Sequence, residues 1–155
     1  MQDRYSITTI SKPVSDFVHN LFNSLVNKLK LHDFIARQQS NYLKEKKSSL
    51  LHGEYILIMD FSENYSMVTQ NEIQAAHFSK VQATIHPIVA YYKTQNENLE
   101  CLSWVAISDH LKHDTVAVNK FQSKFIDFIK TNAAKYPKIR KIYYFTDGCA
   151  AQYKN

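Results

Sequence analysis

The sequence lacks the features that mark secreted, zinc-binding or membrane proteins. Only two of its 155 residues are cysteines, Cys101 and Cys149, and they form neither a C-x-x-C pair nor part of a Cys/His cluster. This spacing argues against a disulfide framework and against a structural zinc site. No apolar run approaches the length of a membrane helix, and the first residues lack the pattern of a secretory signal. We therefore expect a soluble, intracellular protein with no membrane partner.

The size and charge of the chain indicate one globular domain with a basic flank. A chain of 155 residues, 45% of them hydrophobic, suffices for one core but not for two ordinary domains. Residues 1–53 hold 8 Lys or Arg and 4 Asp or Glu, whereas residues 54–155 hold 11 and 10. Such a basic flank suits contact with phosphate backbones. A solvated surface that serves only solubility explains the same charge.

An N-terminal helical appendage is predicted over residues 1–53. Apolar residues recur at three- and four-residue spacing from Pro13 to Leu29, which is typical of one helix stripe. A second helix, with Phe34 and Tyr42 on its apolar side, should end near Gly53. We expect four basic side chains of this second helix to face solvent: Arg37, Lys44, Lys46 and Lys47.

Residues 54–155 are predicted to form an α/β core. Four strands are expected, at 55–61, 82–92, 99–108 and 139–146. A short polar turn makes the second and third strands an antiparallel hairpin, and Pro87 implies a bulge or an unpaired amide in the second. Asp114 should cap a helix that crosses over to the fourth strand, which places this strand parallel to the first. The expected result is a mixed sheet with spatial order 3-2-1-4.

Two of these apolar strands end at aspartates, Asp60 and Asp147. If the first and fourth strands are neighbours, the two carboxylates meet at one end of the sheet, where their mutual repulsion favours a bound cation. Hard oxygen ligands of this kind suit Mg²⁺ or Mn²⁺. A single aspartate at a strand end is more often a turn or cap residue, but two in this topology favour a metal site.

Three segments resemble those of a known group of proteins. They are residues 60–65 (DFSENY), 108–114 (SDHLKHD) and 146–155 (TDGCAAQYKN). These segments resemble transposon-derived animal proteins with a ribonuclease-H-like core of the DDE/DDD transposase type. The resemblance implies that Asp60 and Asp147 are two catalytic metal ligands and that a third acidic residue lies on a later helix. Because the sequence stops at Asn155, before a fifth strand and that helix, we expect a truncated core, as in a fragment or an inactive relic.

The same resemblance implies a nuclear protein that cleaves or transfers DNA strands with Mg²⁺ or Mn²⁺. In such a site Asp60 would bridge two metal ions and Asp147 would bind one of them. Three residues near the end of the sequence could touch substrate phosphates, although a frayed terminal segment is an equal interpretation: Gln152, Lys154 and Asn155. DNA is the expected partner, and the sequence leaves open whether the protein forms a homo-oligomer.

Other polar residues have weaker functional interpretations. Glu63 could approach as an outer metal ligand, but we favour a solvent-facing position. His110 and His113 are interpreted as loop or capping residues in preference to metal ligands. Gln74 and His77 could touch substrate, although solvated loop polarity is the default.

Two alternative functions stay open. A domesticated core of this type could bind DNA without cutting it. The segments 60–62 (DFS) and 146–148 (TDG) also fit the metal-dependent adhesion site of von Willebrand type A domains, which bind protein ligands. That match fails at Asn64, where the adhesion motif needs a second hydroxyl, and at the predicted antiparallel hairpin.

Overall fold

The computed structural model describes residues 9–67 and 81–153 of the chain. The chain divides into two compact units, Met1–Glu45 and Lys46–Asn155. In its described part the first unit is helical, and the second unit contains the sheet. The division falls within a helix. The expected domain boundary lies later, at Gly53, where the helical pattern of the sequence gives way to an apolar strand.

The N-terminal helical run has fewer breaks than expected. α1 (Val14–Asn20), the π-helical turn η1 (Leu21–Leu25) and α2 (Val26–Ser48) follow one another directly. The prediction of two separate helices was wrong, because residues 30–33 contain no glycine or proline to interrupt the helix. The run has no buried residue. None of the helices in the described ranges is long and apolar enough to cross a membrane.

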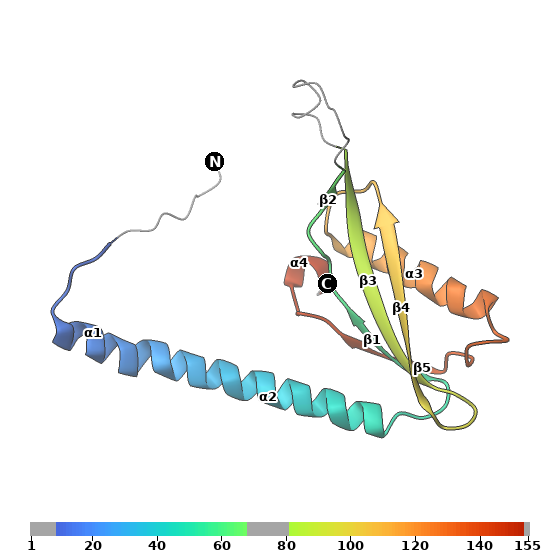
Figure 1. Cartoon of the computed structure of the whole chain (residues 1–155), viewed down its shortest axis with the longest axis horizontal. Coiled ribbons are helices and arrows are strands. Elements are labelled where there is room, and N and C mark those ends of the chain that lie inside the picture. The colour runs from blue at the N-terminus through green and yellow to red at the C-terminus, as the bar shows by residue number, and fades with distance from the viewer. Residues whose placement is uncertain (1–8, 68–80, 154–155) are drawn as a thin grey trace. The chain divides into compact units, whose positions relative to one another are not determined.

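The second unit is built on a mixed sheet (Figure 1). Its strands are β1 (Glu54–Met59), β2 (Tyr65–Ser66), β3 (Gln82–Lys93), β4 (Leu99–Ser108) and β5 (Lys141–Phe145). β3 pairs antiparallel with β1, β2 and β4, whereas β5 pairs in parallel with β1. The α/β class, the mixed sheet and the N-terminal helix are therefore confirmed. The short strand β2 was not predicted.

β3 accommodates Pro87 without a bulge. The register with β4 is continuous across this position, where Pro87 pairs with Val105. On the other side of β3, the last pair with β1 joins Ile88 to Met59. Pro87 therefore lies just beyond the end of β1, where its missing N–H leaves no bond of that ladder unmade.

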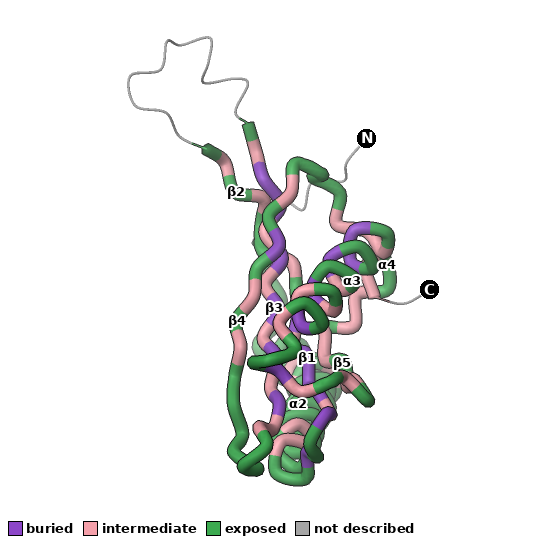
Figure 2. Tube along the Cα trace, turned by 90° about the vertical axis from the view of Figure 1, so that its right-hand side faces the viewer, coloured by how far each residue is buried: buried purple, intermediate pink, exposed green. Residues whose placement is uncertain are grey.

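α3 (Thr115–Thr131) covers one face of the sheet. Asp114 caps it as predicted, because the carboxylate accepts a hydrogen bond from the amide of Ala117 (2.9 Å). Figure 2 shows buried residues along β1, β3 and α3. The buried core between the sheet and α3 consists of Tyr55, Leu57, Met59, Ile88, Ala90, Tyr92, Phe125, Ile129 and Tyr136.

Two lysines at the end of α2 lie over tyrosines of the other sheet face. The Nζ atom of Lys46 is 5.0 Å from the ring centroid of Tyr143, and that of Lys47 is 3.5 Å from the ring centroid of Tyr91. Both lysines are half-buried, so the expectation that they face solvent was wrong. The ammonium groups of the two lysines contact the electron-rich faces of the rings, and their aliphatic chains cover apolar surface.

Candidate functional site

Asp60 and Asp147 follow the ends of two neighbouring parallel strands. The register of β1 with β5 pairs Ile58 with Phe145. Asp60 lies two residues beyond this last pair on the β1 side, and Asp147 lies two residues beyond it on the β5 side. Both residues are exposed. The topology therefore brings the two carboxylates to one edge of the sheet.

Each carboxylate is oriented by a local backbone amide. The Oδ1 atom of Asp60 accepts from the amide of Phe61 (2.8 Å), and that of Asp147 accepts from the amide of Cys149 (2.9 Å). Gly148 permits the turn after Asp147 by adopting a positive φ of 76°. Among the described residues, no basic side chain forms a salt bridge with either aspartate. One oxygen of each carboxylate thus stays available for a ligand.

The ring of Phe61 anchors the chain next to Asp60. It stacks on the imidazole of His113, with centroids 4.3 Å apart and planes at 11°. It also meets the ring of His86 edge to face, with a centroid separation of 4.6 Å and an angle of 75°. Because Phe61 follows Asp60 directly, this aromatic packing fixes the direction in which Asp60 leaves β1.

His86 is a buried polar residue next to Phe61, the residue that follows Asp60. Its side chain is fully buried, with 0% relative exposure. Its Nε2 atom lies 3.3 Å from the hydroxyl of Tyr153, which belongs to the short helix α4 (Ala150–Tyr153). Its Nδ1 atom has no hydrogen-bond partner in the described part of the chain. An unsatisfied buried nitrogen is costly, so this histidine needs an explanation.

Electrostatics connect His86 and Tyr153 to the aspartates. Burial lowers the pKa of His86 to about 4, although its own backbone and the Asp60 carboxylate act in the opposite direction. Burial is also the largest cause of the raised pKa of Tyr153, and the charges of Asp60 and Asp147 raise it further. The phenol of Tyr153 therefore lies within the field of both carboxylates.

Asn64 holds the 108–114 segment as a structural loop. Its Oδ1 atom accepts from Nε2 of His113 (2.8 Å), and its amide nitrogen donates to the carbonyl of Leu111 (3.3 Å). His110 lies 3.7 Å from the carboxylate of Asp114, the helix cap. These contacts support the interpretation of His110 and His113 as loop residues.

Of the other predicted site residues, Arg37, Lys44, Glu63 and Gln152 lie within the described ranges. Arg37 and Lys44 are exposed on α2, and Arg37 pairs with Asp33 (2.8 Å). Glu63 is exposed, as expected, and Gln152 is half-buried in α4. The remaining candidates, Gln74, His77, Lys154 and Asn155, lie outside the described residues.

Sequence reasoning missed His86 and Tyr153. A signal for His86 was present, because Thr84 and His86 lie at alternate positions of β3 and so continue its buried face. Two polar residues on a buried face near a strand-end carboxylate are unusual and point to a site. For Tyr153 no periodic pattern existed, because α4 is only four residues long.

The donor set at the aspartates fits a hydrated divalent cation in part. Two exposed carboxylates, each hydrogen-bonded to the described part of the chain through its Oδ1 atom alone, are ligands that Mg²⁺ and Mn²⁺ accept. In the described ranges no group of three or more His, Cys, Asp or Glu residues is close enough to hold a metal ion. Mg²⁺ usually keeps several waters and needs only one or two protein carboxylates, so the pair fits this mode of binding.

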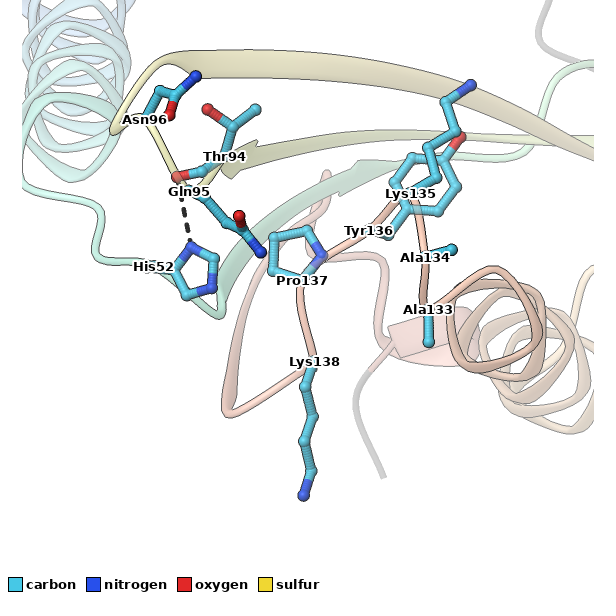
Figure 3. A pocket seen from close by; sticks show the side chains of 10 residues that line it. All are labelled: His52, Thr94, Gln95, Asn96, Ala133, Ala134, Lys135, Tyr136, Pro137 and Lys138. Atoms are coloured by element: carbon cyan, nitrogen blue, oxygen red, sulfur yellow. Dashed lines mark hydrogen bonds between the residues drawn. The ribbon is translucent and has the colours of Figure 1, made fainter.

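The pocket of about 370 Å³ in Figure 3 lies at the other end of the sheet. Its lining includes His52, which precedes β1, and Thr94, which follows β3. The Nδ1 atom of His52 lies 3.3 Å from the carbonyl of Thr94. β1 runs from this end towards Asp60, so the pocket takes no part in the carboxylate site.

Residues 39–155 match the family model described as a domain of unknown function, DUF8701. The match covers most of the chain, which therefore belongs to this family. Searches of curated proteins and of solved structures found no match. The family description assigns no chemistry, so a proposal on function must rest on the geometry at Asp60 and Asp147.

Proposed function

We propose that this protein is a ribonuclease-H-like, transposase-derived domain that binds Mg²⁺ or Mn²⁺ at Asp60 and Asp147 for phosphoryl transfer on DNA. The observation that carries the proposal is the parallel pairing of β1 with β5, because two parallel neighbours lead into Asp60 and Asp147 at the same end of the sheet. The sheet supports the same proposal, since β4, β3 and β1 form an antiparallel series beside the parallel β5. A nuclear location follows from the proposed DNA substrate.

The roles of the residues follow from their chemistry. Asp60 and Asp147 would hold the cation through their free carboxylate oxygens, and the bound cation would activate water or a 3′-hydroxyl and stabilise charge on the phosphate. Phe61 keeps Asp60 in place through its contacts with His86 and His113. The turn at Gly148 keeps the carboxylate of Asp147 on its local amide.

One observation favours the non-catalytic alternative, a domain that binds DNA without cutting it. No third acidic residue joins the pair in the described part of the chain, and two-metal nucleases need more than two carboxylates to hold both ions. The adhesion-domain alternative is disfavoured, because β3 pairs antiparallel with β1 where that fold has a mostly parallel sheet.

Thermal melting with and without Mn²⁺ tests the metal site. Only the folded chain aligns the two aspartates, so Mn²⁺ should raise the Tm of the wild-type protein through linkage. Asp60→Asn and Asp147→Asn should each abolish the increase while the metal-free protein stays folded. Asp127→Asn, which removes an exposed carboxylate from α3, is the matched control and should keep the full response.

A second measurement separates the catalytic from the non-catalytic alternative. Incubation of the protein with a labelled DNA duplex and Mn²⁺ should give strand cleavage that Asp60→Asn abolishes. Metal binding without cleavage would favour the DNA-binding alternative. An equal Mn²⁺ response in the wild type and both aspartate variants would mean that the two residues share no site, and the proposal would fail.

A further inference from the structure

His86 and Tyr153 form a polar pair within an otherwise aromatic cluster. The imidazole of His86 is surrounded by Phe61 at 4.6 Å and Phe121 at 5.3 Å between ring centroids. Its only hydrogen-bonding contact with another described side chain is the hydroxyl of Tyr153, at 3.3 Å. A phenylalanine would fill such a place without an unsatisfied nitrogen, so packing alone does not account for a histidine.

The proton positions in this pair decide what Tyr153 offers to its surroundings. If Nε2 of His86 carries the proton, it donates to the phenol oxygen, and the phenol O–H is free to donate elsewhere. If Nδ1 carries the proton, the phenol O–H donates to Nε2, and the phenol oxygen has only lone pairs left for other contacts. The ring of Tyr153 lies near that of Phe61, the residue after Asp60, with ring centroids 6.5 Å apart. Carboxylates attract a donor and repel lone pairs, so Asp60 and Asp147, whose charges raise the pKa of Tyr153, favour the first arrangement.

We propose that His86 and Tyr153 are positioning residues of the cation site, in which His86 holds the Tyr153 hydroxyl so that it donates a hydrogen bond to a water on the bound cation. This inference rests on the proposed function, because it needs a cation at Asp60 and Asp147. The ligand it concerns is a hydrated Mg²⁺ or Mn²⁺ ion, which keeps several of its waters when two carboxylates bind it. Outer groups of this kind orient the inner ligands and tighten metal binding.

The substitution Tyr153→Phe tests the inference with little change in packing. The ring, which packs against the core, is kept, and only the hydroxyl is lost. Direct Mn²⁺ titration, followed by the EPR signal of free Mn²⁺, should show a Kd about tenfold higher than in the wild type. Tyr144→Phe is the matched control, because it removes a tyrosine hydroxyl from β5 whose pKa responds to burial alone and not to either aspartate. Its Kd should equal that of the wild type.

Two variants of His86 separate positioning from packing. His86→Gln keeps an amide donor at the reach of Nε2, whereas His86→Leu keeps the apolar bulk and removes the donor. We expect the glutamine variant to restore part of the affinity that the leucine variant loses. Should the leucine variant not fold, the comparison of Tyr153→Phe with Tyr144→Phe still decides the question.

The outcomes distinguish this inference from the proposed function. A wild-type protein that binds no Mn²⁺ would overturn both. A wild-type protein that binds Mn²⁺ with the same Kd as Tyr153→Phe would overturn the positioning role alone and leave the aspartate site intact. A weaker Kd in Tyr153→Phe, with a metal-free Tm like that of the wild type, would support the inference, since a merely structural hydroxyl would change the Tm instead.

Discussion

The backbone carbonyl of Gly53 accepts a hydrogen bond from the amide of Arg140 at a distance of 2.8 Å. This bond joins the residue before β1 to the residue before β5, and the register of the two parallel strands begins directly after it. Because β1 and β5 lead into Asp60 and Asp147, Gly53 helps to set the register of the strands that carry the two aspartates, from the far end of the sheet.

Gly53→Ala should destabilise the second unit. Gly53 has a φ of +83°, which an L-residue rarely adopts, and an added Cβ would lie 2.9 Å from the carbonyl oxygen of Lys138. The strain should cost roughly 1–3 kcal/mol, measured by denaturant unfolding. The Mn²⁺ response should weaken as well if the strand register shifts.

A double variant separates the two sources of this strain. The same Cβ would also lie 2.8 Å from the flexible Arg140 side chain, which Arg140→Ala removes. We expect Arg140→Ala alone to be nearly neutral, since the side chain is exposed, and the double variant to recover only a small part of the loss. Full recovery would show that the backbone conformation and the Lys138 carbonyl are not the cause.

The sequence predicted the larger elements of the second unit because their patterns are local. The mostly apolar stretch at residues 99–108 and the short polar turn before it indicated β4, and Asp114 marked the start of α3. β2 could not be predicted, because a two-residue strand exists only through its pairing with β3. The single helical run was missed, because two apolar stretches at helical spacing do not by themselves show whether the helix continues between them.

His86 should make the stability of the fold depend on pH. Its pKa falls from 6.5 to about 4 on folding, so the unfolded chain binds the proton more readily between these values. Stability is therefore fully present above about pH 6.5 and is lost as the pH falls towards 4. The loss should reach about 2–3 kcal/mol, measured as the free energy of unfolding at several pH values.

His86→Gln is the control for this pH dependence. The glutamine does not titrate, so the part of the slope between pH 6.5 and 4 that belongs to His86 should disappear. Titration of carboxylates will remain in both proteins and will dominate at the acid end of the range. An identical slope in the wild type and the variant would mean that His86 takes up its proton as readily in the folded state as in the unfolded one.

The cap of α3 should be sensitive to the side chain at position 114. The carboxylate of Asp114 has a lowered pKa, because it accepts from the amide of Ala117 and lies near His110. Asp114→Ala should lower the Tm at neutral pH, whereas Asp114→Asn, which still caps, should stay close to the wild type. A lowered pKa means that this stabilisation is lost as the pH falls below about 3.8. Equal Tm values for all three proteins would show that the cap contributes nothing.

The sequence predicted the two aspartates of the candidate site but not the residues that surround them. Asp60 and Asp147 could be found because each ends an apolar strand, and a strand end is a local feature. The environment of the pair depends on contacts between distant segments, such as Phe61 with His113 and His86 with Tyr153. No local pattern encodes such contacts, so they emerge only when the sheet and α3 pack together.

The exposed basic residues of α2 should contribute to DNA binding if the proposed substrate is correct. Arg37 and Lys44 are exposed, whereas Lys46 and Lys47 are held over tyrosine rings. Arg37→Gln with Lys44→Gln should therefore weaken binding of a short duplex and make the salt dependence shallower. Each lost phosphate contact should change the slope of log K against log salt by about 0.9.

The control is an equal loss of charge elsewhere, through Lys124→Gln with Lys130→Gln on the exposed face of α3. If only net charge attracts DNA, both double variants will lose the same affinity at low salt, and the basic-flank argument fails. If α2 contacts phosphates directly, only the α2 variant will change the slope, because counterion release depends on contacts rather than on total charge. Lys46→Gln with Lys47→Gln should differ from both by also lowering the Tm, since each substitution removes a cation–π contact with the sheet.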